Sequence, residues 1–224
     1  MALPARQHAL RAIRRLGHLR REAAGVAFIE FALSLPLFIL VSFGTLELAN
    51  LTMTLMKVQR LANMTADIVA QNGVGGNQLN EMQMYDILEA MNVSAQPLDM
   101  AGNGRIIISS VLGVDSNNDG VADRNELSWQ RFSGGLTTET PLLGCWKTSN
   151  TTTLQSGRQL TPGEVLYHTQ VSYRYDPLLI GLLPDTLSVP RTITRTGVYR
   201  GRTSTYRTIL STDGYPPKDG CTTA

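Results

Sequence analysis

A continuous apolar run from Val26 to Leu48 is the feature of this sequence that most limits its fold. The run has 23 residues, and only Glu30 and Glu47 in it are charged. At about 1.5 Å rise per residue, a helix of this length crosses the ~30 Å hydrocarbon core of a bilayer. We therefore predict a transmembrane helix, which leaves room in the 224-residue chain for one modest soluble domain.

The charges on either side of the run predict its direction in the membrane. Residues 1–24 hold six arginines and one acid, whereas Lys57 is the first basic residue after the run. The positive-inside rule then places the N-terminus in the cytoplasm and the C-terminal part across the membrane. We expect Glu47 to be solvated at the far interface, and a contact with a partner helix is the alternative. A secretory signal peptide would have a shorter apolar core and a small-x-small cleavage site, which this run does not offer.

Glu30 lies near the start of the apolar run, where a carboxylate costs a few kcal/mol and usually has a partner. Physics alone leaves two interpretations open. In the first, Glu30 sits among the cytoplasmic headgroups and pairs with Arg20 or Arg21. In the second, a protease cuts after Gly25, and the new ammonium group of Val26 pairs with Glu30 of a neighbouring helix, which gives a register for assembly.

Several features stand together around this position. They are a basic stretch ending in Gly25, Val26 after it, Glu30 five residues beyond Gly25, the aromatic Phe31 next to it, and a later Gly-x-x-Glu at Gly44–Glu47. This combination resembles the N-terminus of class III prepilins, and more closely that of the TadE-like pseudopilins of tight-adherence pilus systems, in which Val26 would be the first and Glu30 the fifth mature residue. Residues 171–202 carry a weaker, compositional similarity to the last strands of such domains.

The resemblance implies a minor pilin or pseudopilin of a Flp-type (type IVc-like) pilus, cleaved after Gly25 by a prepilin peptidase and acting in pilus assembly or adhesion. It implies a single-pass protein of the bacterial inner membrane with a periplasmic or extracellular head. The implied partners are the peptidase, other pilins or pseudopilins, and the inner-membrane assembly platform. The alternative is an uncleaved membrane anchor that carries an extracytoplasmic calcium-binding or adhesion module.

Hydrophobic periodicity continues past the membrane run and predicts one long helix that ends near Gln71, before a glycine-rich stretch. A second helix is predicted over residues 77–93. The period then changes to that of strands, so we predict an α+β fold: a long N-terminal transmembrane and protruding helix packed on a small antiparallel β-sheet head. The predicted strands cover residues 104–114, 126–132, 164–175 and 186–201. The predicted parts are a basic cytoplasmic leader (1–25), the transmembrane and protruding helix (26–72) and an extracytoplasmic α+β head (73–224).

The segment between the first two predicted strands matches the calcium-loop pattern D-x-[DN]-x-[DN]-G-x5-E at every position. Calcium is therefore the one candidate cofactor. A polar hairpin connection explains the same composition, because Asp and Asn tolerate turns and Gly120 suits a sharp one. The candidate ligands are Asp115, Asn117, Asp119, the Val121 carbonyl, Asp123 and Glu126.

Two cysteines, Cys145 and Cys221, lie beyond the membrane run. Outside the cytoplasm we expect one disulfide between them, and two reduced thiols are the alternative. Cys145 belongs to a long polar connection, residues 133–164, which we expect on the surface and tied down by the bridge.

The inventory of chemical groups argues against catalysis. His168 is the one histidine outside the leader, and the chain has no G-x-S-x-G or Walker-type motif. We expect His168 to be a structural residue on a strand and the protein not to be an enzyme. Beyond the leader the chain is net acidic, which also argues against nucleic-acid binding.

Overall fold

The computed structural model describes residues 23–72, 78–177, 191–202 and 208–222, and the fold is given for these residues. The chain divides into two compact units, Met1–Ala49 and Asn50–Ala224. The predicted leader up to residue 22, with Arg20 and Arg21, lies outside the described residues, as does the first part of the predicted strand 186–201. The predicted part boundaries at residues 25 and 72 stay predictions.

The longest element is the helix α2 (Ala23–Gln71), which passes through the whole apolar run. It ends at Gln71, as the periodicity predicts. Its residues 25–46 all have exposed side chains. Residues from Asn50 onward belong to the second unit and carry the apolar stripe that enters its core.

The second predicted helix is α3 (Glu81–Ala95), and it begins at a capping box. The Asn80 side chain accepts a hydrogen bond from the Gln83 backbone N–H (2.8 Å), and the Gln83 side chain accepts one from the Asn80 N–H (3.2 Å). These reciprocal bonds satisfy N–H groups that have no partner within the helix, so the helix begins at residue 81 rather than 77. A short helix, α4 (Met100–Asn103), leads into the first strand.

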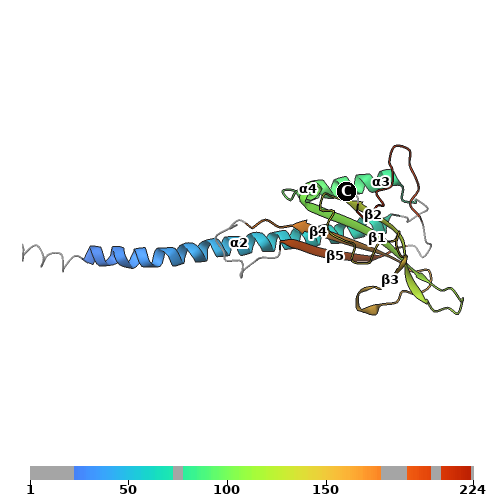
Figure 1. Ribbon diagram of the computed structural model, residues 1–224, viewed down its shortest axis with the longest axis horizontal. Helices are drawn as coiled ribbons and strands as arrows, with labels where there is room; N and C mark the ends of the chain where they lie inside the picture. Colours follow the sequence, from blue (N-terminus) through green and yellow to red (C-terminus); the bar gives the residue numbers. More distant parts are fainter. Residues whose placement is uncertain (1–22, 73–77, 178–190, 203–207, 223–224) are drawn as a thin grey trace, which may run out of the picture. The chain divides into compact units, whose positions relative to one another are not determined.

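The sheet has five antiparallel strands among the described residues, in the order β3-β2-β1-β4-β5 (Figure 1). The predicted α+β fold with a helix packed on an antiparallel sheet is confirmed. The two-residue strand β3 was not predicted, because it is too short to have a period. The strands are β1 (Gly104–Val114), β2 (Arg124–Ser133), β3 (Thr151–Thr152), β4 (Val165–Arg174) and β5 (Thr192–Arg200).

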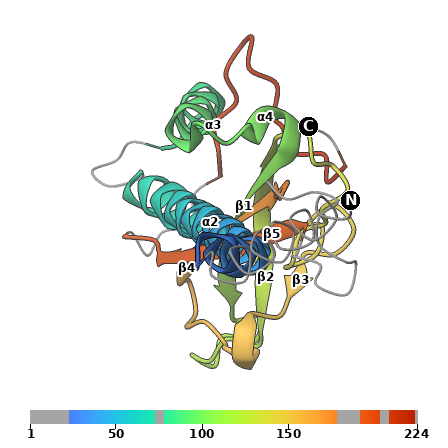
Figure 2. The ribbon, with the colours of Figure 1, turned by 90° about the vertical axis from the view of Figure 1, so that its left-hand side faces the viewer.

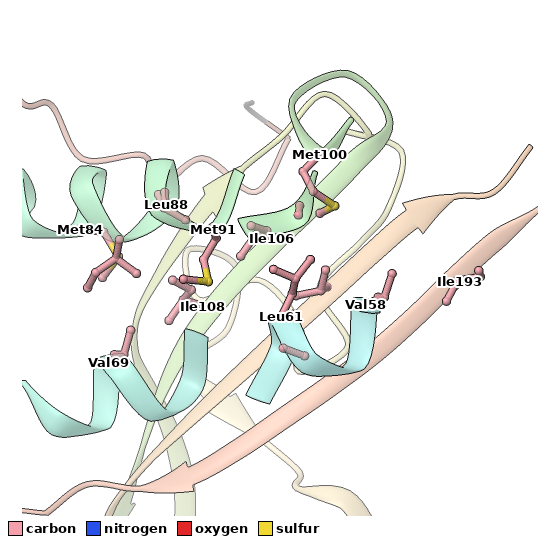
Figure 3. Close-up of a cluster of buried hydrophobic side chains, with 14 of the residues drawn as sticks. Val58, Leu61, Val69, Met84, Leu88, Met91, Met100, Ile106, Ile108 and Ile193 are labelled. Atoms are coloured by element: carbon pink, nitrogen blue, oxygen red, sulfur yellow. The ribbon is translucent and has the colours of Figure 1, made fainter. Parts of the chain in front are cut away.

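Two helices cover one face of this sheet, namely α3 and the part of α2 from Asn50 to Gln71 (Figure 2). Gly197 of β5 allows the close approach of α2, because a Cβ there would lie 2.3 Å from the Ala62 carbonyl oxygen. The core between the helices and β1 is apolar and fully buried (Figure 3); it includes Val58, Leu61 and Val69 of α2, Met84, Leu88 and Met91 of α3, and Ile106 and Ile108 of β1.

The long connection between β2 and β4 lies on the surface, as expected, with most of its residues exposed, and it also covers the other face of the sheet. Its Leu154 and Leu160 are buried against Val111 and Leu166 of the sheet. Two buried glutamines hold the connection in place by its backbone. Gln130 bonds the Gly144 carbonyl (2.9 Å) and the Trp146 N–H (3.0 Å), and Gln170 bonds the Thr140 carbonyl (3.0 Å) and the Leu142 N–H (2.8 Å).

Candidate functional site

The predicted processing site lies at the start of the described part of α2. A Cβ at Gly25 would meet nothing within 4 Å. Val26 and Phe31 are 59% and 60% exposed, and the Glu30 side chain is exposed as well. The four residues are therefore accessible along one stretch of helix, and their role in processing stays a prediction.

The apolar half of α2 has the properties that a membrane requires. Among the described residues, it is the one helix long and apolar enough to cross a bilayer, judged by length and composition. Two of its hydroxyl groups are satisfied locally, since Ser34 Oγ donates to the Phe31 carbonyl (3.0 Å) and Thr45 Oγ1 donates to the Val41 carbonyl (2.8 Å). Pro36 lies within the helix without ending it, which membrane helices tolerate.

Glu47, the second acid of the apolar run, is not the solvated group that we predicted. It is 5% exposed, whereas its neighbours Leu46 and Leu48 are 58% and 63% exposed. The prediction was wrong because the position of an acid along a helix does not say which side of that helix is covered.

The acidic loop is the turn between β1 and β2, and its side chains bind its own backbone. The Asp115 carboxylate accepts hydrogen bonds from the N–H groups of Gly120 (2.9 Å) and Asp119 (3.3 Å). Asn117 Oδ1 accepts a second bond from the Asp119 N–H (3.2 Å), and Asp119 Oδ1 accepts one from the Val121 N–H (2.8 Å). Gly120 has φ +85°, the conformation that glycine adopts most readily. These bonds are those expected of Asp and Asn in a turn.

The last two candidate ligands are also engaged by protein groups. Asp123 accepts hydrogen bonds from the side chain and the backbone N–H of Ser116, and these bonds lower the pKa of its carboxyl. Glu126 lies in β2 and pairs with Arg124 at 2.6 Å. Within the described ranges, no three His, Cys, Asp or Glu side chains gather closely enough to hold a metal. The hairpin explanation accounts for this geometry, and calcium binding stays a prediction.

Cys145 and Cys221 form a disulfide, as predicted. The bridge holds residues 208–222, which we call the C-terminal strap. The Arg105 guanidinium, which is buried under the strap, donates to the Cys221 carbonyl (3.0 Å). Lys147 pairs with Asp219 at 2.7 Å beside the bridge. The connection that covers the second face of the sheet is thereby joined to the end of the chain.

The rest of the strap contacts α3 and β2. The backbone of Leu210 bonds the Leu79 carbonyl and the Glu81 N–H, both at 2.9 Å. Tyr85 of α3 donates its hydroxyl to the Pro216 carbonyl (2.8 Å). Further along, the Phe132 N–H of β2 donates to the Lys218 carbonyl (2.8 Å). The strap therefore covers part of the β2 edge that β3 leaves open. This contact was not predicted, because the segment has neither helix nor strand periodicity.

His168 lies on β4 and is buried, which supports the structural role predicted for it. Burial lowers the pKa of its imidazole, because desolvation penalises the charged form. The residue lines a cavity of about 500 Å³ together with apolar side chains such as Leu142, Leu166 and Val198. The expected lack of enzymatic activity stays an expectation.

A surface groove on α2 was missed by the sequence analysis. It is lined by Met56, Arg60 and Met64 of α2 and by Arg195 and Tyr199 of β5, among others, and has a volume of about 640 Å³. The signal was present, because three α2 side chains at four-residue spacing share a face. The stripe used to predict the helix is the buried one, which lies on the opposite side of α2. We call this surface the α2 groove.

Comparison with known proteins finds one family match, in the N-terminal region. Residues 25–67 match the family model of TadE-like proteins, which confirms the resemblance carried by the N-terminal motif. The match does not include residues 171–202, where the similarity was weaker. No curated protein and no solved structure matches the chain. The family match indicates a protein associated with the tight-adherence pilus, and the apolar helix indicates a membrane anchor.

Proposed function

We propose that this protein is a minor pilin or pseudopilin of a tight-adherence pilus, cut after Gly25 by a prepilin peptidase. One observation carries the proposal. Residues 25–46 form an apolar helix with exposed side chains, and the TadE-like match begins at its first residues. In water so large an apolar surface is unfavourable, so lipid or neighbouring helices must cover it. A pilin helix is covered first by lipid, while it anchors the protein, and then by neighbouring helices, when it packs in the fibre.

The proposed location is the bacterial inner membrane, with the leader in the cytoplasm and the head in the periplasm or outside the cell. Six arginines precede the apolar run, in agreement with the positive-inside rule. The Cys145–Cys221 disulfide supports an oxidising compartment for the head, because such bridges persist outside the cytoplasm.

The proposed role of Glu30 follows from the chemistry of the cut. Cleavage after Gly25 would create an ammonium group at Val26, four residues before Glu30. In hydrocarbon each charge alone is unfavourable. When the helices of two subunits pack, the ammonium of one and the carboxylate of the other neutralise each other. The pairing favours one register between two helices that could otherwise shift along each other, because apolar contacts alone do not fix their relative position.

The function is therefore assembly through helix packing rather than catalysis. The proposed partners are the prepilin peptidase, other pilins or pseudopilins, and the assembly platform of the inner membrane. Adhesion by the head is compatible with this role.

Complementation of a deletion strain tests the proposal. We expect the wild-type gene to restore pili and Gly25→Val to leave a full-length chain without pili. Glu30→Ala should be cleaved but yield few pili, whereas the control Ser34→Ala in the same helix should behave as wild type. Normal pili with Glu30→Ala would contradict the pairing. Normal pili with an uncleaved chain would favour the alternative, a permanent anchor that carries a calcium-binding or adhesion head.

A further inference from the structure

The α2 groove exposes apolar side chains on either side of a positive charge. Met56 and Met64 are 61% and 41% exposed, and the exposed Arg60 lies midway between them on the helix. Tyr199 of β5, which is 40% exposed, completes the apolar lining. Methionine side chains adapt to the shape of a partner and are common at binding surfaces. The groove therefore has the character of a surface that receives another helix.

The charge of the groove is positive and unbalanced. Neither Arg60 nor Arg195 forms an ion pair with a carboxylate among the described residues. The acid at the end of the groove, Asp67, is already occupied, since it pairs with Arg202 at 3.9 Å. A partner that fits the groove should supply two acidic groups between apolar ones.

The outer face of α3 has this pattern. Met82, Asp86, Glu89 and Val93 lie along one line of the helix and are all exposed, with Met82 and Val93 at 39% and 59%. Neither acid forms an ion pair within the part of the chain that the structure describes. We call these four residues the α3 stripe.

We propose that the α3 stripe of one copy of this protein binds the α2 groove of the next copy. The two surfaces are comparable in length, since Met56 to Met64 covers ~12 Å of helix and Met82 to Val93 covers ~16 Å. They also match in order. With the helices aligned, the apolar ends of the stripe meet the two methionines of the groove, and its two acids meet the two arginines.

The contact forms between copies and not within one. The α3 stripe lies opposite the buried side of α3, which carries Met84, Leu88 and Met91, and the groove side of α2 lies opposite Val58, Leu61 and Ala62. Both surfaces therefore point away from the core that the two helices share, whose side chains Figure 3 shows. Because the two surfaces differ, a bound pair keeps one free groove on one copy and one free stripe on the other, so the contact repeats along a row of copies.

The contact is small and depends on concentration. Two helices that meet over ~16 Å bury much less than the ~800 Å² per partner of a standard interface, and exposed ion pairs contribute about 1 kcal/mol at most. The free head is therefore monomeric in dilute solution. Copies held in one membrane reach a far higher effective concentration, and there the contact forms. It involves residues of the second unit alone and does not rest on cleavage at Gly25.

Photo-crosslinking of the full chain in cell membranes tests the proposal. A benzophenone amino acid replaces Met64, the membranes are irradiated, and crosslinked dimers are mapped by mass spectrometry. Mixed isotope labelling identifies the links between copies. We expect the adduct within residues 81–95 of the partner copy. The same probe at Val121, which is 65% exposed in the β1–β2 turn, is the control and should give no adduct there.

Charge reversal supplies the second readout. Arg60→Glu or Asp86→Arg alone should lower the yield of the α3 adduct about fivefold, the ratio that corresponds to a change of 1 kcal/mol. The two together should restore it. Absence of the α3 adduct from wild type, or no recovery in the double variant, would overturn the proposal. The experiment is repeated with Gly25→Val, where the yield should be unchanged, so that a failure of processing is distinguished from a failure of this contact.

Discussion

Arg131 of β2 binds both carboxylate oxygens of Glu81, the first residue of α3, although the two are 50 residues apart in sequence. The guanidinium Nε lies 3.1 and 3.0 Å from the two oxygens, and both side chains are buried. Arg131 also lies over the Trp129 ring, 5.9 Å from its centroid. The pair therefore joins the start of α3 to the sheet at the position where the strap backbone bonds the Glu81 N–H.

We expect removal of one partner of this pair to destabilise the head strongly. Glu81→Ala should lower the free energy of unfolding by about 3–5 kcal/mol, because Arg131 would stay buried without its counter-charge. The double variant Glu81→Leu, Arg131→Met should recover most of that loss. Denaturant unfolding measures both. Arg124→Ala, which breaks a partly exposed pair of the same strand, is the control and should cost less than about 1 kcal/mol. Equal costs for Glu81→Ala and Arg124→Ala would contradict the account.

The disulfide should stabilise the head by holding the C-terminal strap. The bridge spans 76 residues, so its loss through Cys145→Ser, Cys221→Ser should lower the free energy of unfolding by about 4 kcal/mol in the chain-entropy model. Hydrogen exchange of the Phe132 N–H should accelerate in the variant, because its acceptor is the Lys218 carbonyl of the strap. Unchanged exchange at Phe132 would mean that the strap stays docked without the bridge.

The acidic loop should be held by its own hydrogen bonds when calcium is removed. In the presence of a chelator, Asp115→Ala loses the bonds from Gly120 and Asp119, so its unfolding free energy should fall by about 1–2 kcal/mol. Asp86→Ala removes an exposed acid of α3 and should have little effect. An Asp115→Ala variant as stable as wild type in chelator would contradict this explanation. Calorimetric titration with calcium tests the calcium prediction separately. The absence of binding heat in the wild-type protein would contradict that prediction.

His168 should make the head sensitive to mild acid. Its pKa is lowered in the folded state, so below the unfolded value of about 6.5 the unfolded chain binds more protons than the folded one. Stability is therefore complete above that pH and falls as the pH drops below it. His168→Gln, which does not titrate, should flatten the curve of unfolding free energy between pH 7.5 and the folded pKa. The same slope in both proteins would assign the effect to other groups.

The sequence predicts the regular elements well where their period is undisturbed. β1 covers the predicted residues 104–114, because its β-branched run is bounded by turn residues, and α2 ends where the glycines begin. Alternation in β2 was misleading. It placed Leu127 and Trp129 on one side, whereas an irregularity in the register beside Val111 sends Leu127 to the second core and Trp129 to the first.

The candidate sites were predictable to different degrees. The N-terminal motif is a local pattern, and the family match at residues 25–67 confirms that resemblance. The disulfide was predicted from the two cysteines that lie beyond the membrane run. The ion pair of Glu81 with Arg131, the strap and the α2 groove depend on contacts between distant segments, which periodicity does not record. The burial of Leu154 and Leu160 was missed for the same reason.

The mature N-terminus is the most direct test of the proposed function. The protein is isolated from the membranes and pili of cells that make the appendage, and its terminal peptide is identified by mass spectrometry. The account predicts a chain that begins at Val26, and a full-length chain that accumulates when the prepilin peptidase is removed. A terminus at Met1 or Ala2 in cells with normal pili would contradict it.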